Sequence, residues 1–212
     1  MKRNTAVLAC LLALGTTLSL PKETLAQSTP PTSVISLADL RNQLAKVQSE
    51  VSATIISLNS LKEAAKKPGE LNAAATGFTT RFRTLESSVE ATRKNAITVK
   101  ARVKDHYDAW QKTLTEMQNA KLREKAQDRF TESQKQFGKI VAQATEAKEQ
   151  VLPFVSDLKD VVIYLEADLS DEAVDSLSNT IWKLGNRSKS VNSSIGNVIE
   201  QIDRTIKSLP QK

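Results

Sequence analysis

Apolar residues recur at alternating three- and four-residue intervals along almost the whole chain from residue 36 onwards. This seven-residue period is that of the buried seam between packed helices, whereas side chains on a strand alternate with a period of two. Four such series can be separated in the sequence, and they cover residues 36–67, 70–118, 121–168 and 170–209. The sequence therefore predicts an all-α fold, namely an elongated antiparallel four-helix coiled-coil bundle with long second and third helices.

The predicted helix boundaries carry residues that start or stop helices. Ser36 is followed three positions later by Asp39, so we expect Ser36 to cap the first helix. Lys67-Pro68-Gly69 ends this helix, and the heptad register lapses again around Asn119, where a turn is expected. Ser170, followed by two acidic residues, is a suitable start for the last helix. At 1.5 Å per residue the second and third helices would each approach about 70 Å, and the shorter first helix would cover only part of this rod.

A proline and an unusually apolar stretch lie in the third series. Pro153 does not disturb the heptad register, so we expect the helix to kink there or, alternatively, to break in two. Val161-Val162-Ile163-Tyr164-Leu165 is apolar on every face, as is typical of a helix covered on more than one side. This stretch lies either in the thickest part of the bundle or against a partner. In the second case the candidate partner interface consists of Val162, Ile163 and Tyr164.

The N-terminal part of the chain has a different pattern. A positively charged start precedes an apolar run from Ala6 to Leu20, and Thr24-Leu25-Ala26 offers a cleavage site of small residues. We therefore predict a signal peptide over residues 1–26 and export to the periplasm or cell envelope of a bacterium. The alternative is a retained N-terminal anchor, although the run is short for a membrane span. Residues 27–35 are predicted to be a flexible leader, and residues 36–212 a single helical-bundle domain.

The counts of reactive residues exclude most catalytic chemistry. The chain has one histidine, His106, and one cysteine, Cys10, whereas metal sites and nucleophile–base pairs usually need several such residues. His106 occupies a seam position, where we expect it to form a buried polar layer, and Trp110 and Trp182 are expected in the core. No glycine-rich phosphate loop is present, and a filled bundle offers no pocket. We therefore predict no enzyme activity, no cofactor, no metal and no small-molecule substrate.

Charge is segregated along the sequence rather than large in total. Without residues 1–26, 27 Lys and Arg stand against 23 Asp and Glu, and this net charge of +4 is too small for a nucleic-acid binder. Residues 146–175 carry a net charge of −7, residues 183–212 carry +4 and residues 100–129 carry +3. In an antiparallel bundle the two basic segments meet at one end, which predicts one basic and one acidic pole. The candidate anion-binding pole consists of the basic residues closest to the turn, which are Arg102, Lys104, Lys121, Arg123, Lys125 and Arg129.

The second half of the chain also carries a series of short motifs in a recognisable order. They are Trp110, Asn119-Ala120-Lys121-Leu122-Arg123, Pro153-Phe154, Asp157-Leu158, Tyr164-Leu165-Glu166-Ala167-Asp168-Leu169 and Ala173-Val174-Asp175-Ser176-Leu177. In these motifs the chain resembles a bacterial family of exported, all-helical envelope proteins catalogued only as a domain of unknown function. Many members carry a cysteine at the end of the signal, whereas this chain has Leu25-Ala26-Gln27, so no lipid anchor is expected. The resemblance implies a coiled helical fold and an envelope location, and it implies neither an activity nor site residues.

These observations favour a non-enzymatic envelope protein that acts as a helical scaffold, adaptor or chaperone-like binder. Its partner would be an unidentified protein or a second copy of the chain. The alternative is a peripheral binder of an anionic membrane surface or envelope polymer through the basic pole. Salt separates the two, because electrostatic surface binding weakens steeply with added salt whereas an apolar protein interface does not.

Overall fold

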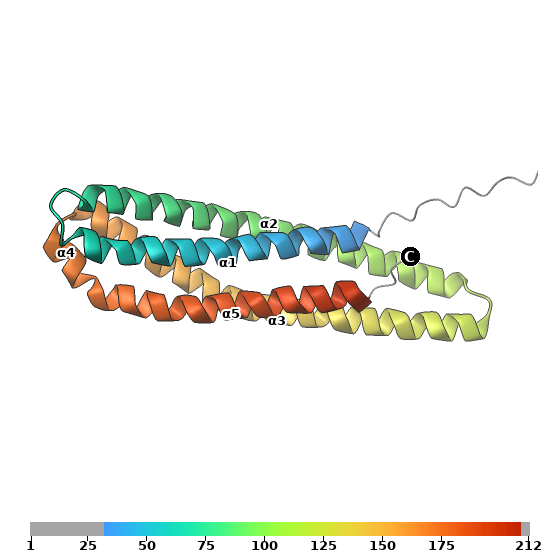
Figure 1. Ribbon diagram of the computed structural model, residues 1–212. Helices are drawn as coiled ribbons and strands as arrows, with labels where there is room; N and C mark the ends of the chain where they lie inside the picture. The colour runs from blue at the N-terminus through green and yellow to red at the C-terminus, as the bar shows by residue number, and fades with distance from the viewer. Residues whose placement is uncertain (1–31, 209–212) are drawn as a thin grey trace, which may run out of the picture.

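The computed structural model describes residues 32–208, within which every regular element is a helix. The elements are α1 (Thr32–Ala64), α2 (Leu71–Glu116), α3 (Ala120–Ala167), α4 (Asp171–Ser176) and α5 (Ser178–Ser208). The prediction of an all-α fold is confirmed, and α2 and α3 are its longest helices, with 46 and 48 residues. Figure 1 shows the four long helices lying along a rod, each antiparallel to the long helix before it. The predicted signal peptide lies outside the described residues.

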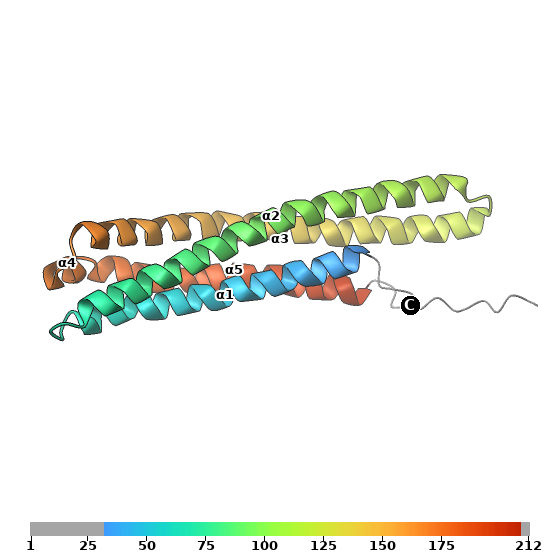
Figure 2. The same ribbon diagram turned by 90° about the horizontal axis from the view of Figure 1, so that it is seen from above.

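α1 and α5, the two shorter of the four long helices, pack against each other and form a central pair. α2 packs on the α1 side of this pair, and α3 packs on its α5 side. Polar contacts fix the register of the central pair, because Gln48 Nε2 donates to the Asn192 carbonyl at 2.7 Å and Arg41 Nε pairs with Asp203 Oδ1 at 3.3 Å. Figure 2 shows α2 crossing obliquely from α1 towards α3, so that α2 and α3 converge only at one end of the rod.

The core follows the predicted seams. Val51 and Leu58 of α1, Phe78 of α2, and Phe154 and Leu158 of α3 are all fully buried in one continuous cluster. Burying an apolar side chain of this size contributes about 1.5–3 kcal/mol to folding, so these positions hold the helices together. A second, smaller cluster lies nearer the end at which α2 and α3 converge, and its buried members are Leu37, Leu40, Val99, Val103, Ile140, Ala147, Val198 and Ile202.

The start of the first helix differs from the prediction. Residues 32–35, predicted to belong to a flexible leader, are helical and form the first turn of α1. Ser36 is therefore not a helix cap but a buried residue inside α1. Its hydroxyl oxygen accepts a hydrogen bond from Arg102 Nη1 of α2 at 3.0 Å, so Ser36 links α1 to α2.

The last predicted helix, residues 170–209, is two helices. Ser170 caps α4 as expected, since its Oγ accepts from the Ala173 amide at 3.1 Å. The interruption comes at Leu177, whose side chain is buried and whose amide donates to the carbonyls of Ala173 and Val174. The backbone of Leu177 stays in the right-handed helical region (φ −80°, ψ −6°) and its carbonyl accepts from the Ile181 amide, so a single residue separates α4 from α5. In contrast, α3 continues through Pro153 as one helix, so the alternative of a break there is wrong.

The turn between α1 and α2 depends on Gly69, whose φ of +83° lies in the left-handed region. We expect Gly69→Ala to lower the free energy of unfolding by about 1 kcal/mol, because a Cβ is strained in this conformation. No atom lies within 4 Å of the added methyl, so the effect would come from the backbone alone. Urea denaturation followed by circular dichroism measures it.

The control is Gly138→Ala, since Gly138 lies within α3 and also has open space around its Cβ position. This variant should gain up to about 1 kcal/mol, because alanine favours a helix over glycine. Equal stability of the two variants would contradict the role given to the turn.

Candidate binding surfaces

Residues 104–129, called the arm here, form a two-helix hairpin that projects beyond the rest of the rod (Figures 1 and 2). The neighbouring helices stop at its base. The first turns of α1 lie beside Arg102 of α2, which donates a hydrogen bond to Ser36. Gln201 Nε2 of α5 donates to Gln136 Oε1 of α3 at 3.1 Å, and α5 ends about two turns after Gln201. Tyr107, at this base, still packs against the cluster that contains Leu37 and Ile202. Further out, α2 and α3 have only each other as neighbours among the described residues 32–208.

Aromatic side chains hold the base of the arm together. Phe130 of α3 is buried and meets Tyr107 and Trp110 of α2 edge-on, with ring centroids 5.7 and 5.5 Å apart. The Tyr107 hydroxyl lies 3.0 Å from Ser133 Oγ. Burial raises the pKa of Tyr107 above its usual value, and the hydrogen bond with Ser133 opposes this shift. Such edge-on pairs add about 0.5–1.5 kcal/mol each to the burial of the rings.

Three residues expected in the core lie nearer the surface. His106 is exposed on the arm, next to the rings of Tyr107 and Trp110, because neither α1 nor α5 covers that side of α2. Trp110 is half-buried for the same reason. Trp182 of α5 is 66% exposed, since the preceding residue, Ile181, takes the core position. The predicted buried polar layer at His106 is therefore wrong.

The six predicted pole residues do not form one cluster. Lys121, Arg123 and Lys125 are exposed at the start of α3, whereas Arg102 lies 17 residues before Asn119, about 25 Å along α2. Arg102 holds Ser36, and Lys104 is paired with a carboxylate of its own helix. Arg129 lies between these two groups, exposed on α3.

The arm itself carries little net charge. It contains six Lys and Arg against five Asp and Glu, which leaves +1, because Lys100 and Arg102 of the basic segment 100–129 lie outside it. Helix α5, which carries most of the other basic segment, ends at the base of the arm. The arm is therefore a nearly neutral surface of mixed charge.

The apolar stretch of α3 is divided between the core and the surface. Val162 is buried in the main core, so of the three predicted interface residues only Ile163 and Tyr164 can meet a partner. Ile163 is 54% and Tyr164 39% exposed, at the end of the rod opposite the arm. Near them, an ion pair between exposed side chains links α2 and α3, where Arg83 Nη2 lies 3.8 Å from Glu166 Oε1.

An apolar groove of about 740 Å³ lies between α2 and α3, midway along the rod. Its floor consists of α1 and α5 residues, and its walls are Val89 to Lys100 of α2 and Phe137 to Leu152 of α3. The groove exists because the facing positions are small: Thr92 and Ala96 on one wall, Ala144 and Ala147 on the other. Buried phenylalanines lie beyond it on either side, Phe78 and Phe82 towards one end and Phe130 towards the other, and half-buried Phe137 lines its arm end.

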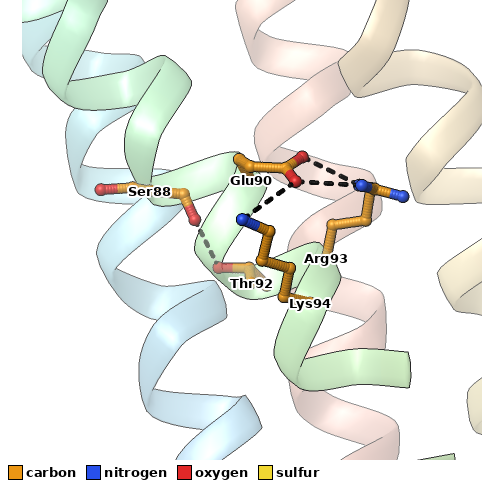
Figure 3. A network of polar contacts seen from close by, with 5 residues as sticks. All are labelled: Ser88, Glu90, Thr92, Arg93 and Lys94. Atoms are coloured by element: carbon orange, nitrogen blue, oxygen red, sulfur yellow. Dashed lines mark hydrogen bonds and ion pairs between the residues drawn. The ribbon is translucent and has the colours of Figure 1, made fainter. Parts of the chain in front are cut away.

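One wall of the groove carries an ion-pair network on α2, drawn in Figure 3. Arg93 donates from Nε and Nη2 to the two carboxylate oxygens of Glu90, both at 2.9 Å, and Lys94 Nζ lies 3.7 Å from Glu90 Oε1. The hydrogen bond from Arg93 is the main cause that lowers the pKa of Glu90 below its usual value. Ser88 lies on the other side of the helix, where its carbonyl accepts from the Thr92 hydroxyl at 2.8 Å.

This groove is not predicted by the sequence pattern, which indicates a filled bundle. The available signal is the run of small residues at successive seam positions, Ala96 of α2 with Ala144 and Ala147 of α3. A seven-residue period shows which residues face the interior but not how much of the interior they fill. Because α2 and α3 also diverge over this length, the small side chains leave an open groove and not merely thinner packing.

Two negative findings apply to residues 32–208. None of the helices described there is long and apolar enough to span a membrane. The same residues contain no group of three or more His, Cys, Asp or Glu side chains that could hold a metal ion.

The fold and these surfaces define an elongated all-α bundle with an arm and an apolar groove. Residues 33–209 match the family described as protein of unknown function (DUF2959), and the chain belongs to this family. The match covers nearly all of the helical part, so it includes the arm and the groove. No curated protein and no solved structure matches the chain.

Proposed function

We propose that this protein is a non-enzymatic component of the bacterial cell envelope that acts as an adaptor or scaffold and contacts a partner protein through its arm. The observation that carries the proposal is the projection of the arm beyond α1 and α5. A two-helix hairpin held out from a rigid bundle presents the sides of α2 and α3 that are covered elsewhere in the rod. Such an element reaches a partner without any change in the body.

The composition of the arm favours a protein partner. Leu122 lies one turn from the tip and is 61% exposed, and half-buried Met117 is close by on the connecting turn. Apolar side chains within a surface of mixed charge resemble the core and rim of a protein interface. Ile163 and Tyr164 offer a second exposed apolar contact at the other end of the rod, which fits a scaffold that bridges two partners.

Replacing Leu122 by Asp tests this proposal. In a pull-down from envelope extract, we expect the immobilised Leu122→Asp chain to retain at least tenfold less of the dominant envelope protein than the unmodified chain. The reason is that an interface loses most of its affinity when a central apolar residue is removed. The matched control is Ile56→Asp, since Ile56 is equally exposed but lies on the body, in α1. Quantitative mass spectrometry of the retained proteins measures both. Equal retention by the two variants would overturn the proposal.

A second candidate is binding to an anionic surface through the tip of the arm. Lys121, Arg123 and Lys125 are exposed at the N-terminus of α3, where the helix dipole adds positive potential. Against it, the arm as a whole carries a net charge of only +1. Co-sedimentation with phosphatidylserine vesicles that is strong at low salt and lost at about 0.5 M salt would favour this candidate over a protein partner.

A further inference from the structure

We propose that the groove between α2 and α3 binds a long-chain fatty acid, with the acyl chain along the groove and the carboxylate against Lys148 and Arg93. This site is separate from the arm and adds a ligand to the proposed function. The inference rests on three properties of the groove: its apolar lining, its dimensions and the charge on its rim.

The lining is that of an acyl-chain site. The floor is formed by Leu40, Leu44 and Val47 of α1 with Ile195 and Val198 of α5. Ile97 of α2 and Leu152 of α3 stand at the edges and are 60% and 44% exposed. An apolar chain in the groove would cover these side chains, and each buried methylene group is worth about 0.8 kcal/mol.

The length of the groove fits one acyl chain. From Phe137 to Leu152 the α3 wall covers 16 residues, and the 15 steps between these two ends span about 22 Å at 1.5 Å per residue. One acyl chain spans half of a bilayer's hydrocarbon core, or about 15 Å, so the groove can hold it lengthwise.

The volume of the groove is sufficient for one acyl chain. At about 30 Å³ for each water-sized group, 16 to 18 methylene groups need about 500 Å³. The groove offers about 740 Å³.

The rim favours an anionic headgroup. Its charged residues are Arg93, Lys100 and Lys148 against the single carboxylate of Glu90, which Arg93 and Lys94 already hold. Within the described part of the chain, Lys100 and Lys148 make no ion pair. The rim thus has an excess of positive charge beside an apolar interior, which is complementary to an anionic amphiphile.

The position of the headgroup follows from the register of the two walls. The contact between Tyr107 and Ser133 shows the antiparallel register of α2 and α3 at the arm. Counted from this contact, Arg93 is 14 residues back along α2 and Lys148 is 15 residues further along α3, so we infer that they lie at about the same level on opposite walls. A carboxylate between them would have Lys148 on one side and, on the other, Arg93, which is also bonded to Glu90. The acyl chain would then extend towards Phe137, where the arm closes that end of the groove.

Calorimetric titration of the purified chain with sodium palmitate tests the assignment. We expect saturable binding of one palmitate per chain, at least tenfold tighter than methyl palmitate, which lacks the charge, or octanoate, which is too short to fill the groove. Absence of palmitate binding would overturn the proposal, and equal binding of methyl palmitate would overturn the role of the rim. Tighter binding of a lysophospholipid than of palmitate would overturn the choice of a fatty acid.

Variants place the ligand in the groove. Ala144→Trp fills the groove from an exposed position on its α3 wall, so it should reduce palmitate affinity at least tenfold without unfolding the chain. The control is Ala142→Trp, an exposed position two residues away and outside the groove. Equal effects of the two substitutions would contradict the site.

A charge reversal gives an independent check if the tryptophan disturbs folding. Lys148→Glu should lower palmitate affinity at least tenfold, whereas Lys139→Glu, exposed on the same helix outside the groove, should not. Leu122→Asp should leave palmitate binding unchanged, so a failure of the arm proposal and a failure of the groove proposal are distinguishable. Unchanged affinity of Lys148→Glu would refute the headgroup position.

Discussion

Leu158→Asp is expected to lower the free energy of unfolding by about 5 kcal/mol, because it removes a buried apolar side chain and places an unpaired charge in its position. Leu158 is fully buried on α3, in the cluster that joins all four long helices. Domains of this size are stable by about 5–15 kcal/mol, so much of the stability would be lost. The melting temperature should fall by about 10–20 °C in thermal unfolding followed by circular dichroism.

Ile163→Asp is the matched control, since Ile163 lies five residues further along the same helix and is exposed. Its melting temperature should stay close to that of the unmodified protein, because surface substitutions usually change stability by less than about 0.5 kcal/mol. A wild-type-like melt of Leu158→Asp would show that the assigned core is wrong.

Phe130→Ala is expected to loosen the arm while the body of the rod stays folded. Phe130 is the buried ring between Tyr107 and Trp110, and replacing a buried phenylalanine by alanine costs about 3 kcal/mol or more. In the arm no third helix compensates for this loss. Because separate parts of a protein can open independently, the effect should be local, and amide protection within residues 104–129 should fall about a hundredfold.

Hydrogen exchange resolved by residue measures this difference. The amides of α1 around Val51 and Leu58 should keep their protection in Phe130→Ala, since these residues belong to the main core cluster, which does not include Phe130. Leu122→Ala, an exposed position on the same arm, serves as the control and should leave arm protection unchanged. Uniform loss of protection along the whole chain would mean that arm and body fold as one unit.

The sequence predicts the helices well because their signals are local and repeated. The turns at Lys67-Pro68-Gly69 and Asn119 lie where expected, and Asn119 caps α3 by accepting from the Leu122 amide at 3.1 Å. The heptad series also identifies the buried residues of α1, such as Val51 and Leu58. Each of these features is encoded within a few turns of one helix.

The surfaces are harder to predict because they depend on where other helices end. His106 and Val103 have the same seam pattern in the sequence, yet His106 is exposed because α1 and α5 do not extend along the arm. The separation of Arg102 from Lys121 likewise follows from helix length, and the groove follows from the divergence of α2 and α3. The length of a neighbouring helix and the angle at which it crosses are long-range properties that a heptad pattern does not contain.

The central claim is that the arm contacts a partner protein, and photocrosslinking in living cells tests it most directly. A photoreactive residue at Leu122 should give one dominant adduct with another protein, identified by mass spectrometry, whereas the same residue at equally exposed Ile56 should give none. Two results would contradict the claim. One is adducts of equal yield from both positions, and the other is an adduct from Ile56 with none from Leu122.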